Sequence, residues 1–200
     1  MVRKGGRRGM PRRSELAKHV CPWWMGYFLA SPIRRFAHNP RKILAPHVRE
    51  GMTVLDLGCG MGTFTLDLAR FAGPLGRVIA MDIQPRMLAE VERRATKAGL
   101  LDRVEMRLAG ADDSWTRGLA GKVDLAVAFF MVHEVSDVPG FLALVRSTLA
   151  PGGRLLLAEP KIHVSSCAFA GTVEAARKAG FEIIDYPRIT RGRAVLLAPL

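Results

Sequence analysis

Three glycines at alternate positions, Gly58, Gly60 and Gly62, follow a short apolar run and precede a segment of helical period. Glycine lets the backbone turn tightly and lets a ligand lie directly against it. Two acids accompany the turn: Asp56 precedes it, and Asp82 ends the next apolar run, twenty residues past Gly62. An acid in that place can accept two hydrogen bonds from a ribose diol, as in nucleotide-binding α/β folds. The pattern therefore predicts a nucleotide-like ligand at one edge of a sheet.

The glycine spacing separates two kinds of nucleotide site. The dinucleotide fingerprint G-x-G-x-x-G/A, counted from Gly58, needs its third small residue at position 63, where this chain has Thr63. The run V-L-D-L-G-C-G-M-G-T at residues 54–63 instead resembles motif I of the class I S-adenosylmethionine (SAM) methyltransferases. The resemblance implies that the turn holds SAM and that Asp82 binds its ribose hydroxyls.

Further segments resemble this family in the same order along the chain. Asp112, with Asp113 as the alternative, stands where the family keeps an acid for the adenine amino group. Residues 129–135 (F-F-M-V-H-E-V) resemble the loop below the sulfonium, and residues 149–154 (L-A-P-G-G-R) resemble the turn before strand five. The resemblance assigns cofactor binding to Asp56, Gly58, Cys59, Gly60, Gly62, Asp82, Ile83, Asp112 and Phe129.

The resemblance covers roughly residues 44–200 and is greatest to the ubiquinone/menaquinone-biosynthesis type of methyltransferase domain. It implies methyl transfer from SAM to a small-molecule acceptor by in-line displacement, with S-adenosylhomocysteine as the product. The attacked atom of the acceptor is not predicted. A SAM-binding protein without catalysis is an alternative.

His133 is the candidate catalytic residue, because it lies where the fourth apolar run ends. Its imidazole could remove a proton from an oxygen, nitrogen or sulfur nucleophile. The alternative is a histidine that bonds a backbone carbonyl and closes the loop. Glu159 and His163, after the fifth run, are candidate acceptor-binding residues together with His133, Trp24 and Tyr27. The histidines and carboxylates lack the compact spacing of a metal site, so no metal is predicted.

Seven short apolar runs alternate with segments of helical period. The predicted strands are Thr53–Leu57, Arg77–Met81, Val104–Leu108, Val123–Phe129, Arg154–Ala158, Phe181–Asp185 and Ala194–Ala198. The predicted helices are Thr63–Phe71, Pro85–Ala98, Val138–Leu149 and Val173–Ala179. Strands that are apolar on both faces predict a mostly parallel sheet covered on both sides. Only a short polar turn joins the last two runs, so the last strand is predicted to be antiparallel. We therefore predict an α/β, Rossmann-like, doubly wound sheet of seven strands with an N-terminal helical cap.

Charge and composition divide the chain into three parts. The net charge is +12 and the pI about 10.6. Residues 1–18 hold seven cations and one acid, so we predict a disordered basic arm there. Residues 19–50 are dense in aromatics and arginines and are predicted to form a helical cap or lid, with a membrane-interfacial surface as the alternative. Residues 51–200 form the predicted SAM-binding domain. The basic arm leaves an rRNA or tRNA methyltransferase as the alternative function, with nucleic acid bound through residues 1–18.

Three scattered cysteines argue against a disulfide scaffold and fit a reducing cytoplasm. The basic start lacks the aliphatic run of a signal peptide. The longest apolar stretches are well under the ~20 residues of a spanning helix, so stable membrane insertion is not expected. The sequence therefore predicts a soluble, cytoplasmic protein, and it does not predict an oligomeric state.

Overall fold

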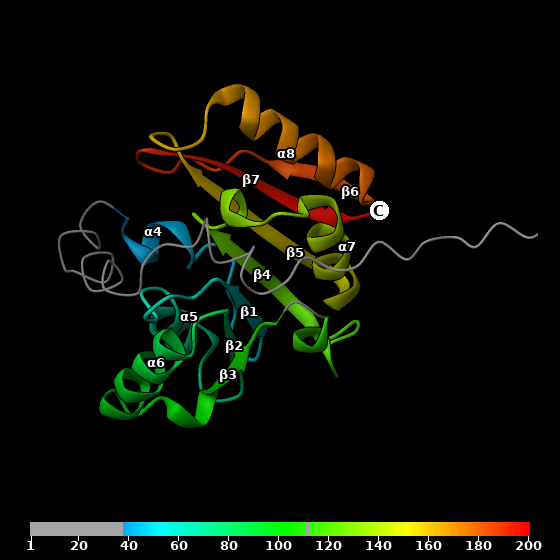
Figure 1. Cartoon of the computed structure of the whole chain (residues 1–200). Helices are drawn as coiled ribbons and strands as arrows, with labels where there is room; N and C mark the ends of the chain where they lie inside the picture. Colours follow the sequence, from blue (N-terminus) through cyan, green and yellow to red (C-terminus); the bar gives the residue numbers. More distant parts are fainter. Residues whose placement is uncertain (1–37, 111–112) are drawn as a thin grey trace, which may run out of the picture.

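The seven apolar runs form one sheet in the computed structural model, which describes residues 38–110 and 113–200 (Figure 1). The strands are β1 (Thr53–Leu57), β2 (Arg77–Asp82), β3 (Val104–Leu108), β4 (Val123–Phe129), β5 (Leu149–Pro160), β6 (Phe181–Asp185) and β7 (Gly192–Pro199). Their order is β3-β2-β1-β4-β5-β7-β6, and β7 runs antiparallel to both of its neighbours while the other pairs are parallel. The predicted doubly wound fold with an antiparallel last strand is confirmed.

The helices and 3₁₀ turns of the described residues precede β1 or connect the strands. They are α4 (Pro40–Ile43), α5 (Thr65–Ala72), α6 (Pro85–Lys97), α7 (Val138–Thr148) and α8 (Ser166–Lys178), with 3₁₀ turns η1 (Leu101–Arg103), η2 (Ser114–Thr116) and η3 (Val132–Glu134). Helix α8 begins seven residues before the predicted Val173. Its start is set by Ser165, whose side chain accepts the backbone N–H of Ala168 at 3.1 Å. The prediction placed the start of this helix by the spacing of apolar residues and did not use the capping residue, so it missed the first two turns of α8.

Helices cover both faces of the sheet (Figure 1). Neighbouring residues of β1 point to opposite faces: Val54 belongs to the buried cluster that contains Leu68 of α5, and Leu55 to the one that contains Leu142 of α7. Both residues are fully buried. This double covering explains why the strands are apolar at successive positions rather than alternating with polar residues.

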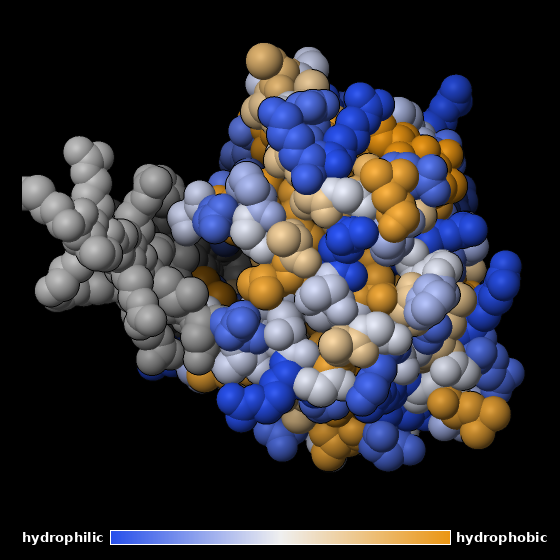
Figure 2. Space-filling view, turned by 90° about the vertical axis from the view of Figure 1, so that its right-hand side faces the viewer, coloured by the Kyte–Doolittle hydropathy of each residue, from blue (hydrophilic) through white to orange (hydrophobic). Residues whose placement is uncertain are grey.

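The parallel strands end on one side of the molecule, at the left of Figure 1. On the right-hand side, where the chain ends, hydrophilic residues are interspersed with small apolar areas (Figure 2). Across residues 38–110 and 113–200, every helix is too short or too polar to cross a membrane. The predicted arm of residues 1–18 and most of the predicted cap, including Trp24 and Tyr27, lie outside the described residues.

Candidate functional site

A cavity of about 260 Å³ opens where β1, β2 and β4 end. This position agrees with the general rule that ligands bind outside the carboxyl ends of strands in open α/β sheets. Seven of the predicted cofactor residues line the cavity: Asp56, Gly58, Cys59, Gly60, Asp82, Ile83 and Phe129. Gly62 belongs to the same turn without lining the cavity, and Asp112 lies outside the described residues.

The glycine turn after β1 adopts a backbone that other residues rarely adopt. Gly58, Gly60 and Gly62 have φ values of 65°, 54° and 76°. A Cβ on Gly58 would lie 2.9 Å from Cγ of Met131, so glycine lets the loop after β4 pack against the turn. A Cβ on Gly60 would meet no atom within 4 Å, although Gly60 lines the cavity. The turn therefore leaves bare backbone facing open space.

Asp82 ties the end of β2 to this turn. One carboxylate oxygen accepts the N–H of Gly60 and the other accepts the N–H of Gln84, both at 2.9 Å. Burial raises the pKa of Asp82, and the N–H groups of Gln84 and Gly60 act against that rise. An ionised carboxylate has about four acceptor sites, so two hydrogen bonds leave capacity for a ligand's hydroxyl groups.

Asp56 lies beneath the turn. Its carboxylate accepts the hydroxyl of Thr65 at 2.6 Å, and its side chain is nearly inaccessible to solvent. Burial raises the pKa of Asp56 to about 7. Burial also raises the pKa of the Cys59 thiol, which therefore stays protonated and is not an activated nucleophile. Among the described lining residues, Asp56, Asp82 and Glu134 are acids and there is no lysine or arginine. The cavity is thus suited to a cationic ligand.

Methionines and aromatic residues form much of the remaining cavity wall, and the part within residues 129–135 was anticipated from the sequence. These residues are Met61, Phe64, Met81, Met87, Trp115, Phe130, Met131 and Phe141. Phe130 has a φ of 62°, which is uncommon outside glycine. Its ring lies 4.2 Å from that of Phe129 and meets His38 edge-on at 5.2 Å. Phe130 and Met131 belong to the segment 129–135 that the sequence already placed near the cofactor, whereas Trp115 and Phe141 reach the cavity from η2 and α7 without a comparable signal in the sequence.

His133, Glu159 and His163 come together beside the cavity without lining it. Glu159, with 1% of its surface exposed, accepts the backbone N–H of His133 at 3.0 Å and contacts its Nδ1 at 2.6 Å. The His163 ring stacks on that of His133 at 6.1 Å. The hydrogen bond to Glu159 raises the pKa of His133 against the opposing effect of burial. With the Nδ1 proton shared with Glu159, Nε2 of neutral His133 is an acceptor.

In residues 38–110 and 113–200 no group of three or more histidines, cysteines or acids is arranged to hold a metal ion. Glu134, Val135 and Ser136 belong to the same loop as His133 and do line the cavity. The loop after β4 therefore places the His133–Glu159 pair at the margin of the cavity.

Comparison with known proteins gives a consistent picture. The family model described as "Methyltransferase domain" matches residues 48–182. The chain is 34% identical over 131 residues to the ubiquinone biosynthesis O-methyltransferase of Methylocella silvestris, covering 66% of this chain and 48% of that protein. It is 31% identical over 137 residues to the nocamycin O-methyltransferase of Saccharothrix syringae, covering 68% and 48%. The chain thus spans about half the length of these curated relatives.

A solved structure supports the fold. The structure of a SAM-dependent methyltransferase from Aquifex aeolicus has a TM-score of 0.78 and 24% identity, covering 90% of this chain and 100% of that one.

Proposed function

This chain belongs to the class I SAM-dependent methyltransferases, and we propose that it transfers a methyl group from SAM to a small-molecule acceptor by in-line displacement. The observation that carries the proposal is the cavity in which the glycine turn and Asp82 face the same space at the carboxyl edge of the sheet. SAM supplies an electrophilic methyl whose leaving group is a neutral thioether. The protein's contribution is then to hold the two reactants in line and to exclude water.

The chemistry of the cavity fits SAM. We assign the ribose hydroxyls to the remaining acceptor positions of Asp82, and close backbone contact to Gly60. A cationic cofactor would favour the ionised forms of Asp56 and Asp82, which burial disfavours in the protein alone. Residues Gly58, Cys59, Gly62, Ile83, Asp112 and Phe129 complete the proposed cofactor site.

The methionine and aromatic wall is assigned to water exclusion around the reacting atoms. Trp115 and Phe141 pack at a ring separation of 6.3 Å on one side, and Phe64 packs edge-on to Phe129 at 4.6 Å on another. Such a lining lowers the local dielectric and keeps water from competing with the acceptor. Trp24 and Tyr27 are proposed to bind the acceptor from the N-terminal segment.

His133 is proposed as the base that accepts the acceptor's proton at Nε2, with Glu159 holding the ring. The two hydrogen bonds to Glu159 fix both the orientation of the ring and the tautomer that leaves Nε2 bare. Because Glu159 raises the pKa of His133, the reactive neutral form accumulates only above that raised pKa. We therefore expect the rate to rise with pH through this range. His163, stacked on His133, is proposed to contact the acceptor.

Replacement of Asp82 tests the cofactor site. Asp82→Ala is expected to abolish SAM binding in calorimetry while the thermal unfolding curve stays cooperative, because the carboxylate is the main polar group for the ribose. Asp102→Ala is the matched control, since Asp102 is an exposed acid on η1, away from the cavity. Equal SAM affinity of the Asp82 variant and the wild type would contradict the assignment.

A second candidate function is methylation of rRNA or tRNA. It is favoured by the net charge of +6 carried by residues 1–18. It predicts salt-dependent RNA binding that disappears when residues 1–18 are deleted. A cytoplasmic location belongs to either candidate and is supported by the scattered cysteines. Tight SAM binding without turnover across a broad panel of acceptors would instead favour a SAM-binding protein without catalysis.

A further inference from the structure

A second hollow lies at the carboxyl edge of the sheet, between the loop after β5 and the β6–β7 connection. Lys161 lines it from the first of these, Arg188 from the second, and Arg193 from the start of β7. The two loops are joined, because the N–H of Lys161 donates to the carbonyl oxygen of Arg191 at 3.0 Å. We call the surface formed by Lys161, Arg188 and Arg193 the basic groove.

The basic groove carries positive charge without compensation from its own walls. No acid occurs among the described residues that line it, and in residues 38–110 and 113–200 none of its three cations makes an ion pair. Arg193 donates to the carbonyl oxygen of Val164 at 2.8 Å and to Oγ of Ser166 at 3.4 Å. These bonds hold the guanidinium group in place and use two of its five N–H donors.

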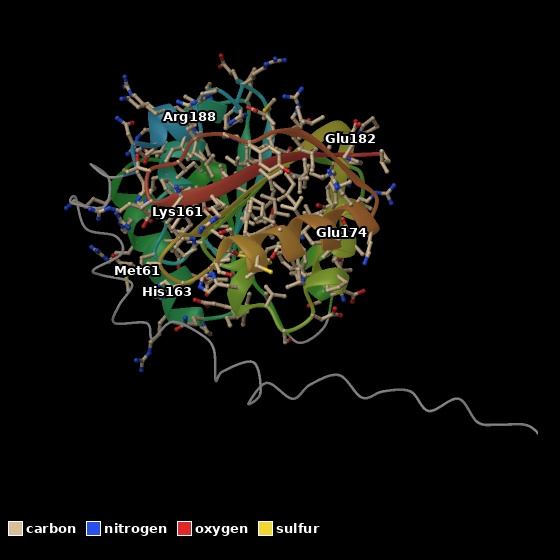
Figure 3. All side chains as sticks on the ribbon, turned by 90° about the horizontal axis from the view of Figure 1, so that it is seen from above. Met61, Lys161, His163, Glu174, Glu182 and Arg188 are labelled. Atoms are coloured by element: carbon tan, nitrogen blue, oxygen red, sulfur yellow. The ribbon has the colours of Figure 1, made fainter. Side chains whose placement is uncertain are left out.

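The acids nearest to the groove in sequence, Glu159 and Asp185, are not part of its lining. Glu159 bonds His133 with both oxygens, and Asp185 accepts the N–H of Tyr186 at 2.7 Å outside the lining. In Figure 3, Lys161 and Arg188 lie on the same side of the molecule as Met61 of the glycine turn, while Glu174 and Glu182 lie on the other side. The positive charge of the groove therefore calls for an anion from outside the described fold.

The N-terminal segment of the chain has the wrong charge to be that anion. Residues 1–37 contain nine lysines or arginines and a single acid, a net charge of +8. This segment joins the fold at His38, whose Nε2 lies 3.0 Å from the carbonyl oxygen of Thr190 in the groove lining. The composition of residues 1–37 therefore offers no surplus of acids that could neutralise the groove.

The groove and the cavity share a wall. Phe130 lines the cavity, and a Cβ on Gly192 of the groove would lie 3.2 Å from Cε1 of Phe130. The two hollows have opposite character, because Asp56 and Asp82 line the cavity whereas cations line the groove. One molecule that spans this wall would place a negative group in the groove and a neutral reacting atom at the cavity.

We propose that the basic groove binds a phosphate-type oxyanion of the methyl acceptor. The proposal rests on the proposed function in that it treats the bound molecule as the acceptor. Arginine and lysine are suited to this chemistry because each charge-assisted N–H···O bond to a phosphate oxygen is about twice as strong as a neutral one.

The oxyanion site is tested with inorganic pyrophosphate and the full chain, by calorimetry at about 0.15 M ionic strength, where long-range attraction is largely screened. Lys161→Gln/Arg188→Gln is expected to weaken binding by about tenfold or more, because it removes two charge-assisted contacts. The control Arg177→Gln/Lys178→Gln loses the same charge from exposed positions of α8 and is expected to bind as the wild type. Absence of binding to the wild type, or equal affinity of the two double variants, would overturn the proposal.

A fluorescent twelve-residue oligouridylate distinguishes the sources of the oxyanion. If the groove variant, Lys161→Gln/Arg188→Gln, binds both probes more weakly than the wild type, the phosphate belongs to a nucleic acid. If it binds only pyrophosphate more weakly, the phosphate belongs to a small acceptor. Either result supports the oxyanion site. SAM affinity of the groove variant is expected to equal that of the wild type. Unchanged SAM affinity in Asp82→Ala would therefore contradict the proposed cofactor site and leave the groove proposal standing. Absence of pyrophosphate binding would contradict the groove proposal and leave the proposed cofactor site standing.

Discussion

Adding one methyl group to the glycine turn tests whether its backbone contacts the cofactor. Gly60 lines the cavity with a φ of 54°, and a Cβ there would meet no protein atom within 4 Å. In Gly60→Ala the cost to the protein itself is therefore only that of placing an alanine at a positive φ, about 1 kcal/mol in the free energy of unfolding. The methyl group would, however, occupy space that we assign to SAM.

The expected loss of affinity follows from the cost of overpacking. An extra methyl group in a well-packed contact costs about 1–3 kcal/mol. The dissociation constant for SAM should therefore rise roughly 5- to 150-fold. Calorimetric titration with SAM measures the affinity, and urea unfolding measures the stability. Both are needed because a small loss of stability alone leaves the affinity of the folded protein unchanged.

Two further glycines provide controls. Gly152 has a φ of 78° and is exposed, and a Cβ there would likewise meet no atom within 4 Å, but it lies away from the cavity. Gly152→Ala is expected to lose about 1 kcal/mol of stability with unchanged SAM affinity. In Gly58→Ala the new methyl would lie 2.9 Å from Cγ of Met131, so that side chain must move within the cavity and affinity should fall as well. If Gly60→Ala and Gly152→Ala bind SAM equally well, the turn does not approach the cofactor and the reasoning fails.

Three other substitutions make separate predictions. Glu159→Gln removes the carboxylate that raises the pKa of His133, so the rising limb of the pH–rate profile should move to lower pH; an unmoved limb would argue against His133 as the base. Folded Asp56 keeps its proton up to its pKa of about 7, whereas an unfolded Asp loses it near pH 4, so stability should fall by about 4 kcal/mol as pH rises from 4 to above 7. Asp56→Asn should reduce this fall in stability between pH 5 and 8 in urea unfolding and leave the part that Asp82 and His133 contribute, because their pKa values are also raised. An unchanged fall would contradict the assigned burial of Asp56. Ser165→Ala should cost about 1 kcal/mol of stability through the lost cap of α8, and an unchanged urea midpoint would show that the cap contributes nothing.

The bounds of several strands could be read from the sequence. Strands β1, β3, β4 and β6 begin and end at the predicted residues, because apolar runs bounded by glycines and polar turns are a local signal. Strand β5 is longer than predicted, from Leu149 to Pro160. Leu149 already pairs with Val123, but regular pairing resumes only at Arg154 opposite Leu125, and the irregular stretch between them contains Gly152 with a φ of 78°. The apolar run on which the prediction rested begins after this irregularity, so the early pairing of Leu149 has no signal in the local sequence.

The core of the candidate cofactor site also followed from the sequence. Asp56, Gly58 and Asp82 were expected at one edge because the carboxyl ends of parallel strands meet there, and the cavity lies at that edge. Topology alone brings these residues together, so a motif followed by a strand-end acid is sufficient to locate them.

Contacts between segments far apart in the chain required the tertiary structure. Glu159 bonds His133 from the neighbouring strand's end, and Lys161 and Arg188 meet in one groove although 27 residues separate them. The residues themselves are visible in the sequence, but their distances depend on strand register and on the paths of the loops after β5 and β6. The sequence by itself thus determined the fold and the cofactor edge, because both follow from local periodicity and strand direction. The His133–Glu159 pair and the basic groove depend on tertiary packing, because it brings together residues from separate strands and loops.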